Sequence, residues 1–308
     1  MKKTRFKCPN MTHEKLVALI RSQGLPPDFI QTVKRWYVPL AASIARCHKK
    51  SPLIIGVQGS QGSGKSTLAL FLKHLLGHEY MLHCVALSLD DFYLTLAERK
   101  ELARSVHPLL ITRGVPGTHD VTLAIDTINA LTLANDTQAC FVPRFDKALD
   151  DRVTRSDWEP VDSPVDVVIL EGWCIGTEAQ ADSELRSPIN DLERIEDPDA
   201  SWRSYSNQKL KKDYAKLFGM LDKLIVLKAP SFESVYDWRW LQEQKLIEQW
   251  ERENSDVNTQ LLDENGVRRF ISHYERLTRH SLANISGKAD WLLTLNDQHL
   301  ITNLVERK

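Results

Sequence analysis

A glycine-rich loop early in the chain limits the fold more than any other feature of the sequence. The loop reads Gly59-Ser60-Gln61-Gly62-Ser63-Gly64-Lys65-Ser66-Thr67 and matches the pattern GxxxxGK[ST]. It follows the apolar run 53–57 and precedes the helical run 68–76. Glycines let backbone N–H groups turn inward around a phosphate, and the following helix N-terminus adds partial positive charge. The loop predicts a nucleotide triphosphate site, with Lys65 on the β and γ phosphates and the Ser66 hydroxyl on Mg²⁺.

Short apolar runs alternate with amphipathic stretches after residue 50. Buried strands are expected at 53–57, 82–87, 165–170, 224–227 and 291–295, with a fainter one at 139–142. Thr95 and Glu98 have capping-box spacing, Asp120 can cap a helix over 121–133, and Ser231 can cap a helix that begins after Pro230. This alternation predicts an α/β fold with a parallel sheet covered by helices on both faces.

The chain divides into two expected parts. Residues 1–50 carry apolar positions at helical spacing, interrupted by Gly24-Leu25-Pro26-Pro27, and predict an N-terminal helical extension. Residues 51–308 form the main domain. Within it, the polar and acidic stretch 176–207 is expected to be an insertion or mobile loop, and 231–253 a long helix suited to act as a lid.

Composition excludes several classes of protein. The 40 Lys and Arg balance 41 Asp and Glu, so no global field attracts nucleic acid or an acidic membrane. The longest stretch without a charged side chain, 51–64, is too short and polar to span a bilayer. The basic N-terminus lacks the apolar core of a secretory signal, and the five cysteines are widely spaced, which is typical of reduced thiols. A cytoplasmic protein is expected.

Acidic residues at strand ends are the candidates for catalysis. Asp90 and Asp91 follow the second strand, and Glu171 ends the strand at 165–170. In a parallel sheet these ends lie at the same edge as the glycine loop. Asp90 can accept the proton of an attacking hydroxyl and orient Mg²⁺, while Glu171 can hold Mg²⁺ through water. Capping of the next helix by the two aspartates, and a solvated acid at Glu171, are the alternatives.

Cationic side chains in three further segments are candidates for binding anions. In the loop 113–120, Arg113 and His119 are suited to an anionic or hydroxylated acceptor. Arg144 and Lys147 follow the fainter strand, and Arg239 lies among aromatics on the expected lid helix, from which it can reach phosphates. A simple turn with a helix cap, surface charge and a packed aromatic helix are the corresponding structural alternatives.

Five segments together resemble the phosphoribulokinase, uridine kinase and pantothenate kinase group of P-loop kinases. They are 59–67, 88–93, 113–120, 143–147 and 168–172. Within that group the sequence is most similar to the plant-type D-glycerate 3-kinases and their bacterial and fungal relatives, over about residues 50–300. The order and spacing of the segments agree with the group, although the N-terminal helices and the stretch 176–207 lie outside its shared motifs.

The resemblance implies a P-loop α/β three-layer sandwich with a mainly parallel sheet of about five strands. It implies transfer of the γ-phosphate of ATP to a hydroxyl of a small metabolite, with Mg²⁺ as cofactor. It assigns the base to Asp90, the metal ligands to Ser66, Asp90 and Glu171, and the lid arginine to Arg239. With Lys65, these residues form the expected catalytic set. Acceptor contacts are expected at Asp91, Tyr93, Arg113, His119, Arg144 and Lys147.

The acceptor stays open at the level of sequence. D-Glycerate, the leading expectation, needs a cation for its carboxylate, which Arg113 or Arg144 can provide. A uridine- or cytidine-type kinase would need an aromatic platform, for which Phe92, Tyr93 and Trp173 are available, and a pantothenate-type kinase is a further alternative. A regulatory nucleotide-binding protein without transferase activity is the alternative from another class. The expected assembly is a monomer or a homodimer.

Overall fold

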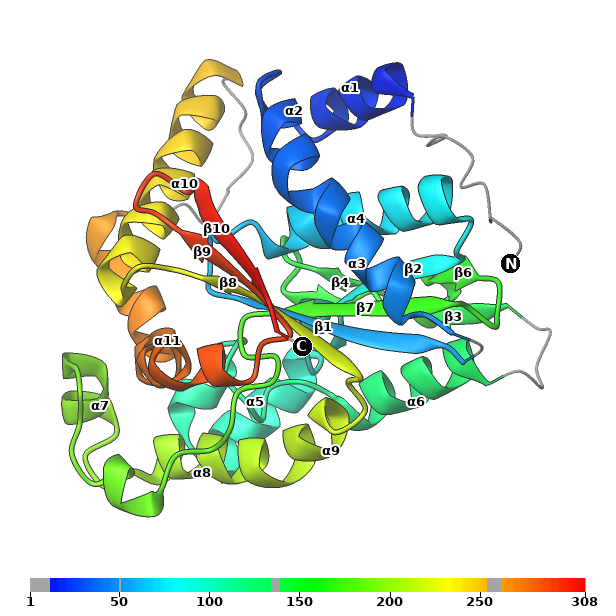
Figure 1. Ribbon diagram of the computed structural model, residues 1–308. Coiled ribbons are helices and arrows are strands. Elements are labelled where there is room, and N and C mark those ends of the chain that lie inside the picture. The colour runs from blue at the N-terminus through cyan, green and yellow to red at the C-terminus, as the bar shows by residue number, and fades with distance from the viewer. Residues whose placement is uncertain (1–11, 50, 134–138, 254–261, 308) are drawn as a thin grey trace.

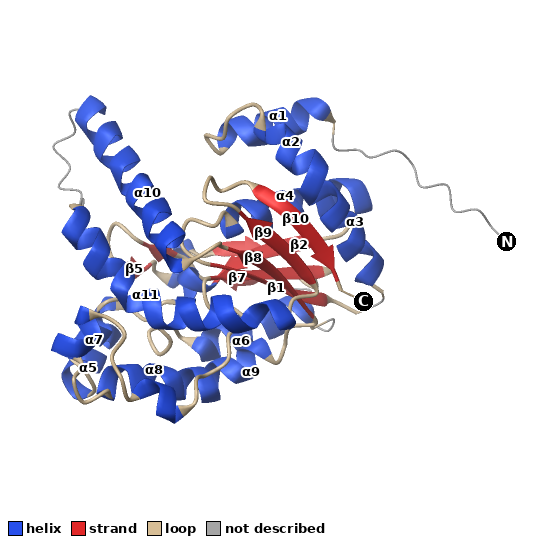
Figure 2. Ribbon diagram, turned by 60° about the vertical axis from the view of Figure 1, so that its left-hand side comes forward, coloured by secondary structure: helices blue, strands red, loops and turns tan. Residues whose placement is uncertain are grey.

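A six-stranded sheet forms the centre of the protein (Figures 1 and 2). The computed structural model describes residues 12–49, 51–133, 139–253 and 262–307. The strands run in the order β10-β9-β8-β1-β7-β2, and all are parallel except β10, which is antiparallel to β9. Their bounds are β1 Leu53–Gly59, β2 Cys84–Ser88, β7 Val167–Gly172, β8 Lys223–Lys228, β9 Trp291–Leu295 and β10 Ile301–Glu306. The expected parallel core is confirmed, with one antiparallel edge strand added.

Helices cover both faces of this sheet. On one side lie α1 His13–Ser22, α2 Phe29–Thr32, α3 Val38–Cys47 and α4 Lys65–Tyr80, with a π-helical turn, Val33–Tyr37, between α2 and α3 (Figure 1). On the other lie α5 Leu96–Ser105, α6 Val121–Thr132, α7 Asp191–Glu196, α8 Ser201–Lys209, α9 Ala215–Phe218 and α11 Glu264–Asn284. The long helix α10 Phe232–Glu253 packs against α11. The expected caps at Thr95 and Asp120 are confirmed.

Strand register brings the predicted motifs to one edge of the sheet. Glu171 of β7 pairs with Val57 of β1 on one side and with Ser88 of β2 on the other. The glycine loop follows β1 and Asp90 follows β2, so both begin level with Glu171. The central strands are apolar on both faces, as parallel strands covered by helices must be. The sequence thus places its polar groups where the strands end.

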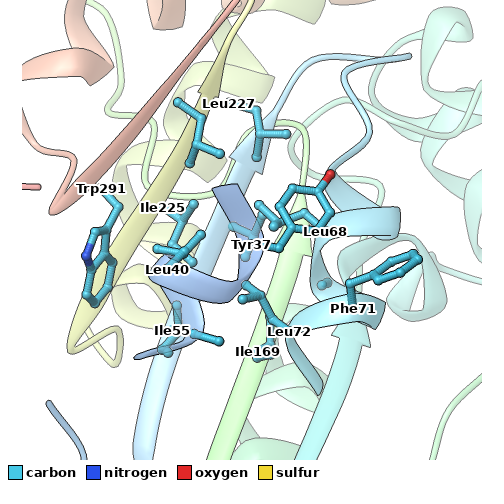
Figure 3. Close-up of a cluster of buried hydrophobic side chains, with 14 of the residues drawn as sticks. Tyr37, Leu40, Ile55, Leu68, Phe71, Leu72, Ile169, Ile225, Leu227 and Trp291 are labelled. Atoms are coloured by element: carbon cyan, nitrogen blue, oxygen red, sulfur yellow. The ribbon is translucent and has the colours of Figure 1, made fainter. Parts of the chain in front are cut away.

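The N-terminal helices belong to the main core. Tyr37 and Leu40 lie in the same buried cluster as Ile55 of β1 and as Phe71 and Leu72 of α4 (Figure 3). The chain turns between α1 and α2 at the expected break. The helical prediction is confirmed for 12–49, whereas 1–11 and 50 lie outside the described residues. These helices complete the layer that α4 begins.

The fainter strand expected at 139–142 is wrong as a member of the central sheet. β3, Cys140–Val142, pairs with β6, Glu159–Val161, in a separate two-stranded antiparallel sheet. A second small pair follows, β4 Phe145–Asp146 with β5 Asp151–Arg152. The middle residue of β3, Phe141, is 49% exposed, which a buried parallel strand would not allow.

The stretch 176–207, expected to be an insertion or mobile loop, contains helices. It contains a 3₁₀ turn, Asp182–Leu185, then α7 and most of α8. Its acidic residues are not all solvated, because the buried Asp197 pairs with the buried Arg203 at 2.8 Å, and the buried Glu193 pairs with the partly buried Arg276 at 2.6 Å. These ion pairs anchor the segment on its own helix and on α11. No helix in the described parts of the chain combines the length and apolar character needed to cross a membrane.

Candidate active site

The glycine loop wraps around a site for an anion. β1 ends at Gly59 and α4 begins at Lys65, so the helix N-terminus faces the loop. Gly64 has φ 85° at the helix N-cap, a conformation that L side chains rarely adopt. The hydroxyls of Ser60 and Ser63 are buried without a hydrogen-bond partner among the described residues. Unpaired buried donors beside a helix N-terminus fit a phosphate chain.

Ser66 and Glu171 form the candidate metal site. The Ser66 hydroxyl donates to Glu171 Oε1 at 2.8 Å across the gap between α4 and β7. Glu171 is 5% exposed, and its Oε2 has no partner among the described residues. A buried orphan carboxylate oxygen beside a hydroxyl is the hard oxygen donor set that Mg²⁺ uses together with phosphate oxygens and water. The residues present therefore fit Mg²⁺.

A cleft of about 550 Å³ opens beside the glycine loop. Gln61 and Gly62 of the loop line this cleft, and Arg239 reaches it from α10. Five more of the predicted side chains also line it: Lys65, Asp90, Tyr93, Arg113 and Lys147. Gly62 has φ 76°, and a Cβ there would lie 2.9 Å from Cβ of Trp238 on α10. The glycine thus lets α10 lie directly against the loop. The cleft brings together the predicted base, the loop lysine and the predicted lid arginine.

Asp90 is held between two partners in the cleft. Its Oδ1 accepts from the Tyr93 hydroxyl at 2.9 Å and its Oδ2 accepts from Lys147 Nζ at 2.7 Å. Burial raises the pKa of Asp90, but Lys147 and then Lys65 outweigh burial and lower the pKa to about 2. The carboxylate is therefore ionised at neutral pH and available to accept hydrogen bonds.

A short hairpin, β4 with β5, carries Lys147 of the cleft lining. Lys147 lies in its turn, and Asp150 on the same turn pairs with Arg113. The buried Arg99 of α5 also pairs with Asp150 and donates to its backbone carbonyl. This buried guanidinium fixes the hairpin, so Arg113 and Lys147 face the cleft from positions set by packing.

Comparison with known proteins identifies the family. No model of a known protein family matches the chain. The chain is 36% identical over 244 residues to "Uncharacterized kinase mug58" of Schizosaccharomyces pombe, covering 77% of this chain and 83% of that protein. This chain belongs to the same family of P-loop kinases.

Two D-glycerate 3-kinases are also similar to this kinase. It is 32% identical over 196 residues to "D-glycerate 3-kinase, chloroplastic" of Arabidopsis thaliana, which covers 61% of this chain and 40% of the plant protein. The solved structure of D-glycerate 3-kinase from Cryptococcus neoformans matches with a TM-score of 0.69 at 27% identity, covering 90% of this chain and 98% of that one. The chain is a phosphotransferase, and the regulatory alternative without transfer loses its support.

Three predicted acceptor contacts of the kinase, Asp91, Arg144 and His119, lie outside the residues that line the cleft. Arg144 pairs with Asp91 at 3.0 Å and also with Glu159 of β6. Burial raises the pKa of Asp91, against the opposing effect of Arg144. The Asp91 carboxylate also accepts from the Phe145 backbone N–H at 3.2 Å. Asp91 and Arg144 therefore tie the 3₁₀ turn after β2 to the segment that carries Lys147.

His119 lies behind the cleft. Its ring stacks on Tyr93 at 4.4 Å between centroids, and its Nδ1 lies 2.5 Å from the Tyr214 hydroxyl. The side chain is 5% exposed, and burial lowers the pKa of His119 to about 4, so the ring is neutral at pH 7. The structure thus makes His119 a support for Tyr93 and places it among the lining of a different, smaller pocket.

Sequence reasoning missed several side chains of the kinase cleft. They are Gln242 and Lys245 of α10 and Phe270 and Tyr274 of α11. Tyr274 donates to the Arg113 carbonyl at 3.0 Å and meets Trp173 edge to face. The apolar spacing of Val267, Phe270, Ile271 and Tyr274 predicts an amphipathic helix and was the signal available for α11.

Proposed function

We propose that this kinase transfers the γ-phosphate of ATP to a hydroxyl group of a small anionic metabolite, with D-glycerate as the first candidate. The observation that carries the proposal is the charge of the cleft. Of the charged side chains that line it, Asp90 is the sole acid among the described residues, while Lys65, Arg113, Lys147, Arg239 and Lys245 are cations. The triphosphate accounts for Lys65 and Arg239, and the cations that remain suit a carboxylate on the acceptor.

The acceptor hydroxyl would be activated by Asp90. Because its carboxylate is ionised and lies in the same cleft as Lys65, it can orient the hydroxyl in line with the γ-phosphate and take up the proton as the new P–O bond forms. Lys65 would stabilise the charge on the transferred group. Tyr93 keeps Asp90 in place through its hydroxyl. Phosphoryl transfer depends mainly on such placement and charge neutralisation.

Magnesium would be held by Ser66 and Glu171, with Asp90 as a further oxygen ligand. Held there, Mg²⁺ would neutralise the charge that develops on the phosphate oxygens. Helix α10 would act as a lid that brings Arg239 to the phosphates. Arg239 pairs with the buried Glu243 at 2.6 Å, four residues later on the same helix, which supports the guanidinium in its place.

Lys147 and Arg113 would bind the acceptor carboxylate. Lys147 is 62% exposed at its side chain and pairs with Asp90, so an incoming carboxylate can share it. Arg113 is 26% exposed and held by Asp150. Both line the same cleft as the base, where the acceptor would lie. The similarity to two D-glycerate 3-kinases supports this choice of acceptor.

The test is release of ADP by the purified protein with Mg²⁺ and ATP. The acceptor panel is D-glycerate, L-glycerate, uridine, cytidine and pantothenate. We expect release with D-glycerate, lost in Asp90→Asn and kept in Asp126→Asn, a matched substitution of an exposed residue on α6. Release with a nucleoside or with pantothenate alone would replace glycerate as the acceptor. Full activity of Asp90→Asn would refute the assignment of the base.

A further inference from the structure

A second pocket, of about 230 Å³, lies on the other side of the glycine loop from the cleft. It borders Ser63, Gly64 and Thr67 of the loop and helix α4, and Gly62 lines both spaces. The γ end of a triphosphate points toward Lys65 and the cleft. The α-phosphate, which carries the ribose and base, therefore lies toward the opposite end of the loop. The second pocket is where a nucleotide base attached to that phosphate would project.

The walls of this pocket come from two distant parts of the chain. Leu25, Phe29 and Thr32 belong to the N-terminal helical region, and His299 and Leu300 belong to the turn between β9 and β10. Each of the three N-terminal side chains is partly exposed. A volume below the ~300–1,000 Å³ of pockets that enclose whole drug-sized ligands suits a single ring system.

The turn between β9 and β10 is rigidly built. Asn296 Oδ1 accepts from the backbone N–H groups of Gln298 and Leu300 at 3.1 and 2.9 Å. His299 has φ 62°, and its ring lies against Trp238 at 4.1 Å between centroids, with the ring planes tilted by 35°. Its Nε2 is buried with no hydrogen-bond partner among the described residues. Leu300 borders the pocket and is 58% exposed. The pocket therefore offers an apolar surface at Leu300 and an unpaired ring nitrogen at His299 to a ligand.

We propose that the N-terminal helical region forms one wall of the binding pocket for the adenine base of ATP, facing the turn that carries His299 and Leu300. Leu25, Phe29 and Leu300 would cover the faces of the base, and His299 Nε2 would hydrogen-bond its edge. Phe29 is suited to this because its ring is fixed by Phe71 and Tyr37, at 5.6 and 6.0 Å between centroids. Leu25, Phe29, Thr32 and Tyr37 are then part of the nucleotide site. The inference rests on the proposed use of ATP.

The experiment compares two ligands that differ in the base. Affinities for ATP and for inorganic tripolyphosphate are measured by calorimetry on the full chain, with Mg²⁺ and no acceptor. Thr32→Phe fills the pocket, and we expect it to raise the Kd for ATP at least tenfold while the Kd for tripolyphosphate changes less than twofold. Gln31→Phe adds the same ring at an exposed neighbouring position that does not line the pocket, and should leave both constants unchanged.

A second variant protects the test against misfolding. Leu300→Ser removes an exposed side chain and should weaken ATP binding several-fold without affecting thermal unfolding or tripolyphosphate binding. Unchanged ATP affinity in both variants, or equal weakening of both ligands, would overturn the inference while leaving the kinase proposal intact. A wild-type chain that binds neither ligand would instead overturn the proposed function and the inference with it.

Discussion

The ion pair between Lys147 and Asp90 gives the sharpest test of the active-site electrostatics. Asp90 has a pKa of about 2 against an ordinary 3.8, a difference worth about 2–3 kcal/mol in favour of the ionised form. Burial alone would raise the pKa of Asp90, so the cations lower it by more than this net difference. Lys147 has the larger effect of the two lysines. In Lys147→Met the burial of Asp90 is opposed mainly by Lys65. We expect the pKa of Asp90 to rise by about two units, to near or above its ordinary value.

The assay follows the carboxylate directly. Carboxyl ¹³C NMR, with the Asp90 signal assigned by its loss in Asp90→Asn, should show no titration of Asp90 above about pH 3.5 in the wild type and a midpoint about two units higher in Lys147→Met. The sign follows from the charge, because removing a cation favours the protonated acid. Once the acceptor is known, kcat/KM of Lys147→Met should fall as the pH is lowered through about 4–5, whereas kcat/KM of the wild type stays constant over that range.

Two controls separate the ion pair from other effects. Lys147→Arg keeps the charge and should keep a depressed pKa at Asp90. Lys100→Met, at an exposed lysine of α5, removes a charge far from the site and should not move it. If the Asp90 signal titrates at the same pH in Lys147→Met and in the wild type, Lys147 does not set the charge of the base, and the reasoning fails.

Three further variants test other parts of the site and fold. Glu171→Gln should raise the Mg²⁺ concentration for half-maximal activity about tenfold or more, measured by metal titration, because it removes a carboxylate ligand. Arg239→Gln should lower kcat about tenfold or more at saturating ATP with little change in the KM for ATP, measured by steady-state kinetics, because the proposed role of Arg239 is to stabilise the transition state. Arg203→Met should lower the free energy of unfolding by about 3–5 kcal/mol in urea, because it removes the guanidinium partner of the buried Asp197 and leaves that carboxylate only His107 at 3.9 Å and backbone N–H donors.

Matched controls exist for each of these variants. Glu178→Gln and Arg268→Gln change side chains that are 74% and 62% exposed at sites away from the cleft lining. Arg194→Met removes an arginine that is 61% exposed and should cost less than about 1 kcal/mol. An unchanged metal requirement in Glu171→Gln, a loss confined to the KM for ATP in Arg239→Gln, or a stability loss in Arg203→Met no larger than in Arg194→Met would contradict the respective assignment.

The sequence predicted the edge of the sheet where the chemistry lies because that information is local. Each motif sits at the end of an apolar run, and in a parallel sheet the register of neighbouring strands follows from burial on both faces. Glu171 and Asp90 therefore come together with the glycine loop as expected. The same logic predicted the helix over 231–253, since Arg239 lies on α10 and reaches the cleft.

The sequence did not predict which charged residues form ion pairs with partners far along the chain. Arg144 and Arg113 both lie in sequence patterns suited to binding anions. Arg144, however, forms ion pairs with Asp91 and Glu159, whereas Arg113 lines the cleft. Nothing in the local sequence distinguishes them, because the partners lie 53 and 15 residues away. The expectation of a solvated acidic loop at 176–207 has the same cause. Glu193 is acidic, but its partner Arg276 lies 83 residues later, on α11.

The first two turns of α10 limit how the proposed lid can move. Trp238 Nε1 donates to the Asp297 carbonyl at 2.8 Å, and the Ser234 hydroxyl donates to Asp297 Oδ1 at 2.7 Å. Trp238 also touches the glycine loop at Gly62 and the ring of His299. Any closure that rotated the start of α10 would break these contacts and disturb the turn on which the base is proposed to rest. The closing motion must therefore act from Arg239 onward, while the start of the helix stays fixed to the nucleotide site.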